Sequence, residues 1–271
     1  MNNRLLQRQP ALFIPHGGGP CFFMDWSPAD TWVAMGNFLK QVAGTLPQRP
    51  AAIIMVSAHW MEAQFRVTGH ANPALIYDYY GFPAHTYELT YSAPGEPGLA
   101  GRVAQMLNEQ GLEAQVDTER GFDHGMFIPL KMMFPEADLP VIQLSFRKDL
   151  DPQAHVQLGQ TLAALRDENI LIIGSGMSFH NMRAYGDSRF SELSDVFDDW
   201  LTKAVESPAP ERAAQLQNWA KAPHAYACHP QGHEEHLIPL MVVAGAAGPA
   251  PGRKVYSERV MKTRISAFRF D

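Results

Sequence analysis

Short continuous apolar runs recur along the chain, separated by longer amphipathic stretches. Uninterrupted apolar runs are typical of strands that are buried on both faces of a sheet. They predict strands at Ala11–Ile14, Ala52–Ala58, Pro140–Ser145 and Ile170–Gly174. Weaker patterns add short strands at Arg66–Gly69 and Ala114–Asp117, and one or two final strands within Lys254–Phe270.

Between these runs, apolar residues repeat at helical spacing. The spacing predicts helices over Asp30–Thr45, Pro97–Gln110, Pro129–Phe134, Pro152–Asn169, Ser191–Val205, Glu211–Ala220 and Glu234–Ala247. Strands that alternate with helices indicate an α/β fold. We therefore expect a single catalytic domain over residues 1–271, an α/β sandwich with a central mixed, largely parallel sheet flanked by helices.

Composition and charge exclude some classes of protein. The 271 residues are 46% hydrophobic with a net charge of −6, so nothing points to nucleic acid or an anionic membrane as a partner. The longest apolar run, Leu237–Ala247, contains a proline and is shorter than the ~20 residues of a membrane span. No signal peptide is recognisable, and Cys21 and Cys228 allow at most one disulfide. We expect a cytoplasmic protein.

The most informative residues are the eleven histidines, because several stand where a predicted strand ends. His16 and His59 close the first two strands, and His180 follows the strand that begins at Ile170. In an open α/β sheet, ligands bind outside the carboxyl ends of the strands. Imidazole is the commonest metal-binding side chain. These positions predict one metal site at the carboxyl ends of the strands.

Two further segments carry histidines. His124 stands between glycines in a predicted loop, next to Asp123, which either orients the imidazole or only caps the turn. The segment His229–His236 holds three imidazoles and two carboxylates, Glu234 and Glu235, which are alternative oxygen ligands. His233 and His236 are three residues apart and share a face if this segment is helical.

The remaining histidines have weaker cases. We interpret His70, His85, His155 and His224 as background, since His155 lies on a predicted helix without a partner and His224 lies in a loop. His85 is the open case among them, because its tyrosine-rich loop could line a pocket. The segment Asn72–Pro97 is rich in tyrosine and proline and predicts an ordered loop. Its tyrosines either stack on a substrate ring or simply pack the loop, and Tyr80 and His85 are the candidate substrate-binding residues.

Several familiar catalytic motifs are absent. The run from His16 to Pro20 has neither the phosphate-loop spacing nor the dinucleotide fingerprint. The Gly174–Gly176 segment does not match the Gly-x-Ser-x-Gly turn of serine hydrolases. The two cysteines are far apart, which excludes a zinc knuckle.

A set of motifs spread in order over nearly the whole chain resembles the class III extradiol ring-cleavage dioxygenases, specifically their DOPA 4,5-dioxygenase-like branch. The matching stretches are Pro15–Gly17, Val56–Trp60, Gly81–Pro83, Tyr91–Gly95, Gly121–Gly125, Pro140–Ser145, Leu162–Asp167, Gly174–Asn181 and Glu235–Leu240. The resemblance implies a non-haem Fe(II) site, with Zn(II) in the same position in some members.

The resemblance also implies roles for individual residues. His16, His59 and His236 match the metal ligands, and His180 matches either a fourth ligand or an acid/base group. His124 matches a histidine that handles protons and positions the substrate. Members of the family often have a shorter spacing between the His-Pro and Glu-His pairs than this chain has, which leaves His229 or His233 as alternatives to His236.

The implied reaction is the opening of a catechol ring by O₂ to give a semialdehyde. A metal held by about three protein ligands keeps positions open for substrate, and His124 or His180 would take the second catechol proton. The expected partners are a catechol and O₂, and a homo-oligomer is left open. Two other functions remain: a zinc-dependent hydrolase that uses Glu234 or Glu235 as base, and a non-enzymatic interaction protein of the same fold.

Overall fold

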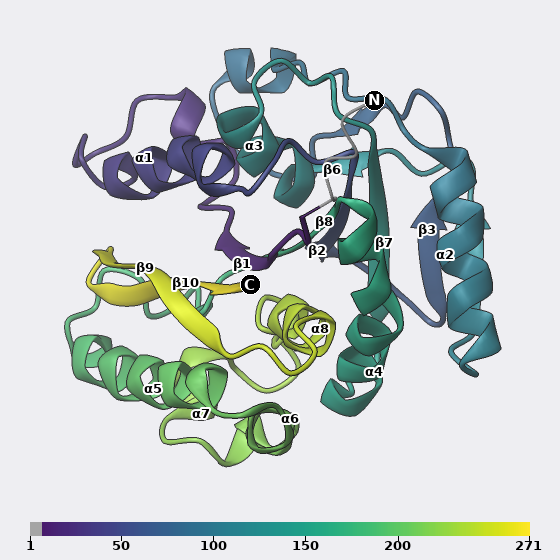
Figure 1. Cartoon of the computed structure of the whole chain (residues 1–271). Coiled ribbons are helices and arrows are strands. Elements are labelled where there is room, and N and C mark those ends of the chain that lie inside the picture. The colour runs from purple at the N-terminus through teal and green to yellow at the C-terminus, as the bar shows by residue number, and fades with distance from the viewer. Residues whose placement is uncertain (1–6) are drawn as a thin grey trace.

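A mixed sheet of eight strands forms the centre of the protein (Figure 1). The computed structural model describes residues 7–271. The strands run in the order β5-β3-β7-β2-β8-β1-β10-β9 across the sheet. Their bounds are β1 Ala11–Pro15, β2 Ala52–Glu62, β3 Phe65–Thr68, β5 Ala114–Asp117, β7 Val141–Arg147, β8 Ile170–Gly176, β9 Gly252–Val260 and β10 Thr263–Phe270.

The four middle strands, β7, β2, β8 and β1, are parallel. Their side chains are almost entirely buried, as expected for parallel strands covered on both faces. The sheet becomes antiparallel where β3 meets β7 and where β10 joins β1 and β9. A separate parallel pair consists of β4 (Leu75–Ile76) and β6 (Phe122–Asp123). The expected mixed α/β sandwich is confirmed.

Helices cover both faces of the sheet (Figure 1). One apolar core lies between the sheet and α2, α4, α5 and α8, and a second core lies between the opposite face and α1 and α3. The helices are α1 Val33–Val42, α2 Pro97–Glu109, α3 His124–Met133, α4 Pro152–Leu162, α5 Arg189–Glu206, α6 Ala209–Gln217, α7 Ala225–Cys228 and α8 Ile238–Ala246. Short 3-10 turns occur at Cys21–Phe23, Ala43–Thr45, Ala84–Glu88, Ala163–Glu168 and Trp219–Lys221.

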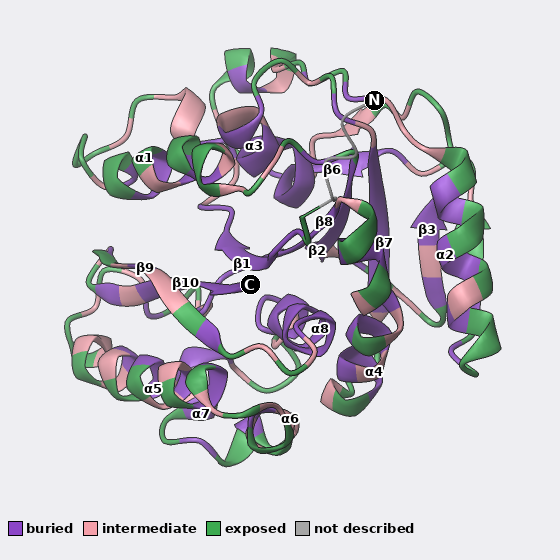
Figure 2. Ribbon diagram, viewed as in Figure 1, coloured by how far each residue is buried: buried purple, intermediate pink, exposed green. Residues whose placement is uncertain are grey.

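Helix α8 is buried along its whole length, which Figure 2 shows as an unbroken purple helix. A helix that is apolar on all sides belongs in the interior, and α8 packs against β8, β1 and α4. The helix begins at Ile238 rather than at Glu234 as predicted. Pro239 fits the first turn of a helix but not its interior, so Glu234–Leu237 form a turn before it.

Helix α3 begins five residues earlier than the predicted segment 129–134 suggested, and His124 is its first residue rather than part of a loop. The Asp123 carboxylate caps the helix by accepting a hydrogen bond from the Met126 N–H. Pro129 lies inside α3 and has no N–H to donate to the Gly125 carbonyl. That carbonyl instead accepts the Ser175 hydroxyl of β8, which ties the helix to the sheet.

Candidate metal centre

Three imidazoles from distant parts of the sequence converge at the carboxyl ends of the central strands. His16 follows β1, His59 lies near the end of β2, and His236 lies in the turn before α8. One ring nitrogen from each lies within 4.8 Å of the others. The ring centroid of His16 lies 4.9 Å from that of His59 and 5.2 Å from that of His236. The described residues thus bring three imidazole nitrogens close enough together to hold one metal ion.

The backbone around each imidazole explains why it reaches this point. Strand β2 continues to Glu62, beyond the predicted end at Ala58, but its pairing with β7 is interrupted between Val56 and Met61. His59 lies in that irregular stretch, and bulges of this kind re-aim side chains near sites. At Gly176 an added Cβ would lie 2.1 Å from the His236 carbonyl oxygen, so only glycine admits this turn so close to β8.

The three imidazoles are neutral, and some of their ring nitrogens have no hydrogen-bond partner. Burial, followed by the neighbouring imidazoles, lowers the pKa of His16, His59 and His236 well below the ordinary value. Both ring nitrogens of His16 and the Nε2 of His59 are buried without a hydrogen-bond partner in the described structure. Buried polar atoms without partners are rare and need an explanation. A cation bound by these neutral nitrogens would satisfy them, so the residues fit a metal.

Asp78 holds two imidazoles on the side of the centre formed by β2 and α3. Its Oδ1 accepts hydrogen bonds from the backbone N–H of His124 at 2.9 Å and from its Nδ1 at 2.8 Å. Its Oδ2 lies 3.6 Å from Nδ1 of His59. Burial raises the pKa of Asp78, but the hydrogen bonds from His124 outweigh burial and lower it overall. Because a carboxylate only accepts, Nδ1 of His124 carries the proton and Nε2 is left as an acceptor.

Glu235 has the same relation to the other two imidazoles. Its Oε1 lies 3.1 Å from Nδ1 of His236 and 3.7 Å from Nδ1 of His180. The rings of His180 and His236 stack with centroids 3.3 Å apart. Burial, followed by the nearby His233, lowers the pKa of His180 to about 4, so its ring is neutral at pH 7. Carboxylates that bind the second nitrogen of a ligand imidazole fix its tautomer and orientation.

Asp78 is absent from the sequence-based predictions. Of the two roles considered for Asp123, the structure supports the cap and not the orientation of His124. Asp123 caps α3 and bonds Ser57, Gln143 and Arg120. The orienting carboxylate for His124 is Asp78, 46 residues away along the chain. Its one sequence signal is an acid embedded in the tyrosine-rich segment 77–80.

The alternatives to His236 lie elsewhere. His229 is buried behind the site, where its Nε2 bonds the Ser178 carbonyl at 2.9 Å and burial lowers its pKa to about 3. His233 is exposed at the surface. Because residues 233–236 are not helical, these two histidines do not share a helix face. Only His236 of the three comes near His16 and His59.

The remaining histidines lie outside the centre. His70 and His224 are exposed, whereas His155 is buried in α4. The prediction that His155 lacks a partner was wrong, because its Nε2 accepts the Arg147 N–H at 3.0 Å and its Nδ1 bonds the Asp151 carbonyl at 2.6 Å. His85 is exposed and bonds the Phe23 carbonyl at 3.2 Å.

A cavity of about 390 Å³ opens over the five imidazoles His16, His59, His124, His180 and His236. Apart from these rings its walls are mostly aromatic and apolar. They include Trp26, Trp32, Tyr79, Tyr80, Phe82, Met177, Met182, Tyr185 and Met261. Tyr80 lines the cavity, with 87% of its surface exposed, whereas His85 is not part of the lining. Aromatic walls around a few polar groups are typical of small-molecule sites.

Residues 10–268 match the family described as the catalytic LigB subunit of aromatic ring-opening dioxygenase. The chain belongs to this LigB family. It is 36% identical to a dioxygenase named tasH from Hapsidospora irregularis over 96% of this chain and 84% of that protein. It is 42% identical to the 4,5-DOPA dioxygenase extradiol of Beta vulgaris over 87% and 86% of the two chains. Both relatives cover most of the chain.

A solved structure gives the same result for the fold of this LigB chain. It is the crystal structure of an uncharacterized protein from Escherichia coli K12, with a TM-score of 0.77 and 29% sequence identity. The match covers 97% of this chain and all of that one. The expected resemblance to extradiol dioxygenases is confirmed, and the protein is an oxidoreductase of the extradiol ring-opening type. LigB dioxygenases depend on a non-haem metal, which agrees with the histidine-rich centre.

Proposed function

We propose that this dioxygenase uses Fe(II) to open the ring of a catechol with O₂, giving a ring-opened semialdehyde. The observation that carries the proposal is the group of three neutral imidazoles beside two further imidazoles. Of those two, His124 is hydrogen-bonded to Asp78 and His180 lies 3.7 Å from Glu235. His16, His59 and His236 would hold the iron, which supplies the binding of both catechol oxygens and of O₂. Three protein ligands leave open positions for these molecules.

His124 is the proposed base for the catechol. Its Nδ1 is bound to Asp78, so the free Nε2 is the nitrogen that accepts the second catechol proton. Asp78 remains ionised and stabilises the imidazolium that forms, as an orienting carboxylate does in other acid/base pairs. His180, which stacks on His236 and lines the same cavity, is the second proposed acid/base group, with the role of a further ligand as the alternative.

The aromatic cavity fits a planar ring. The side chains of Trp26, Tyr79 and Phe82 provide ring faces, and the cavity has room for a substituted catechol. Tyr80 is a proposed substrate contact at the mouth. The proposed small-molecule partners are therefore a catechol and O₂.

We also propose the cytoplasm as the compartment. Cys21 and Cys228 are both free and buried, as expected where thiols stay reduced. Among residues 7–271, the structure has no helix with the length and apolar character of a membrane span.

Anaerobic reconstitution tests the proposed function. The apoprotein is loaded with Fe(II) or with Zn(II), then caffeate, DOPA or protocatechuate is added with oxygenated buffer. We expect oxygen uptake and a new yellow product with the iron form only. Ester or amide hydrolysis by the zinc form, without oxygen uptake with any catechol, would instead support the hydrolase and overturn the proposal.

A further inference from the structure

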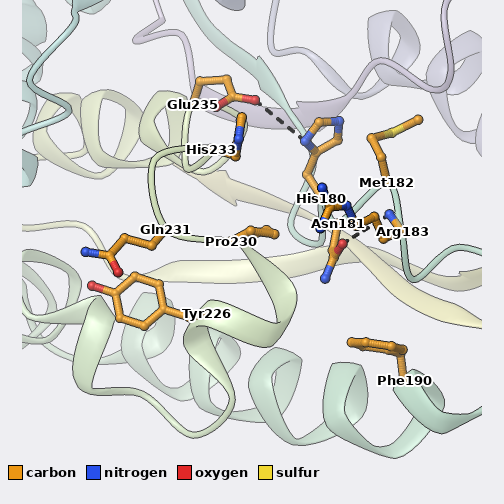
Figure 3. A pocket seen from close by; sticks show the side chains of 10 residues that line it. All are labelled: His180, Asn181, Met182, Arg183, Phe190, Tyr226, Pro230, Gln231, His233 and Glu235. Atoms are coloured by element: carbon orange, nitrogen blue, oxygen red, sulfur yellow. Dashed lines mark hydrogen bonds and ion pairs between the residues drawn. The ribbon is translucent and has the colours of Figure 1, made fainter.

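A second cavity of about 650 Å³ lies beside the metal cavity (Figure 3). It is formed by the segment after β8, the first turn of α5, helix α7 and the segment before α8. The lining residues are His180, Asn181, Met182, Arg183, Phe190, Tyr226, Pro230, Gln231, His233 and Glu235. Phe190, Tyr226 and Gln231 line this second cavity but not the metal cavity.

The two cavities adjoin each other. His180 and Met182 line both of them, and Glu235 connects the second cavity to His236 through its hydrogen bond. The side chain of Met182 is unbranched and 71% of the residue is exposed, so little packing holds it in one place. A molecule whose ring occupies the metal cavity can therefore extend past His180 and Met182 into the second cavity.

The walls of the second cavity indicate what would occupy it. Phe190 and Tyr226 present aromatic rings on the side of the view away from His180 and Glu235 (Figure 3). Gln231 lies beside Tyr226 and supplies an amide for a polar edge. One guanidinium, from Arg183, and one carboxylate, from Glu235, line the cavity, so neither sign of charge dominates. These groups favour a flat, uncharged, largely apolar occupant.

We propose that this second cavity is a subsite for an uncharged aromatic substituent of the substrate, so that the physiological catechol carries a second ring. The proposal rests on the proposed function, because it places the catechol ring at the metal. The catechol occupies the metal cavity, and its substituent passes His180 to pack against Phe190 and Tyr226.

Two catechols, one with a second aromatic ring and one without it, test whether the second cavity binds that ring. With the iron-loaded enzyme, 3,4-dihydroxybiphenyl carries the second ring, and 4-methylcatechol is the short analogue. We expect KM for the biphenyl to be lower by about tenfold or more, since burying an aromatic ring contributes well over the equivalent of one decade in affinity. Equal KM values for the two compounds would overturn the proposal.

Variants locate the effect in the second cavity. Phe190→Ala and Tyr226→Ala should each raise KM for the biphenyl several-fold more than KM for 4-methylcatechol. Gln231→Trp, at an exposed position, should fill the cavity and exclude the biphenyl selectively. Val196→Ala truncates an apolar side chain on the same helix as Phe190 but outside the lining, and should alter neither value. Thermal unfolding of each variant checks its fold.

The results distinguish failure of the proposed subsite from failure of the proposed function. Turnover of both probes, with variants that change both KM values in parallel, would overturn the subsite and leave the proposed function intact. Lack of turnover of every catechol by the iron form would overturn the proposed function itself and, with it, the subsite.

Discussion

At the scale of residues, the centre consists of imidazoles paired by carboxylates. Asp78 contacts His59 and His124, and Glu235 contacts His236 and His180. Asp78 is hydrogen-bonded to His124, a proposed acid/base group, and Glu235 to His236, a proposed ligand, whereas His59 and His180 lie 3.6 Å and 3.7 Å from these carboxylates. Such outer partners keep ligand imidazoles in the productive tautomer.

Removal of the Asp78 carboxylate should slow catalysis. We expect Asp78→Ala to lower kcat of the iron-loaded enzyme by about 10- to 100-fold, as for other outer-shell partners, because His124 loses the acceptor for its Nδ1–H. Asp78→Asn should recover part of the loss, since its amide oxygen still accepts that hydrogen bond. Steady-state oxygen uptake measures the effect.

The matched control is Asp138→Ala, which removes an exposed carboxylate paired with Arg49. It should leave kcat unchanged. A similar kcat for Asp78→Ala and the control would show that the carboxylate does not position His124.

The ligand set gives a second prediction at this scale. His16→Ala, His59→Ala and His236→Ala should each abolish tight Fe(II) binding, because two remaining imidazoles do not complete the site. His233→Ala, which removes an exposed imidazole from the same loop as His236, should retain the metal. The iron content of each variant after gel filtration measures the effect. Retention of iron by His236→Ala would contradict the assignment of His236 as the third ligand.

Individual residues differ in how well the sequence predicts their place. His16, His59 and His236 were named from strand ends and family motifs, and the structure brings them together. Asp78 was missed because its contact with His124 joins positions 46 residues apart, which no local pattern encodes. His85 was kept as a candidate because of its tyrosine-rich surroundings, but its ring bonds the Phe23 carbonyl outside the cavity lining.

At the scale of elements, the buried strands were predicted well because continuous apolar runs leave few alternatives. Several errors concern helix boundaries set by single residues, and the short elements β4, β6 and α7 were not predicted. The start of α3 at His124 depends on the Asp123 cap, and the start of α8 at Ile238 depends on Pro239. The irregular pairing of β2, which turns His59 out of the sheet, arises from contacts with β7 that the sequence of β2 alone does not show.

His155 joins α4 to the end of β7, and its titration should be visible in stability. Burial lowers its pKa from 6.5 to about 4, and the hydrogen bond between Nδ1 and the Asp151 carbonyl opposes this shift only in part. A lowered histidine pKa means that the unfolded chain takes up the proton first. The contribution of neutral His155 to the free energy of unfolding is therefore complete above pH 6.5 and is lost as the pH falls toward 4.

The test compares urea unfolding of the metal-free wild type with that of His155→Gln, which cannot titrate. We expect the stability advantage of the wild type to shrink by about 2 kcal/mol between pH 7.5 and pH 5. Other titrating groups affect both proteins alike and cancel. An advantage that stays constant over this range would contradict the assignment.

At the scale of the whole molecule, the parallel centre of the sheet explains why residues from the two ends of the chain share one site. Strands β1, β2 and β8 point their carboxyl ends to the same edge, and the buried helix α8 follows the loop that carries His236. This arrangement was predictable from the alternation of strands and helices. The neighbouring cavity beside His180 was not, because it forms between α5, α7 and two loops.

The most direct test of the central claim is the fate of oxygen. The iron-loaded protein is given a catechol under ¹⁸O₂, and the product is analysed at once by mass spectrometry. We predict a ring-opened product with the mass of the catechol plus both labelled atoms, one O₂ consumed per catechol, and no product from His16→Ala. A quinone with hydrogen peroxide, or a product labelled from water alone, would contradict the account.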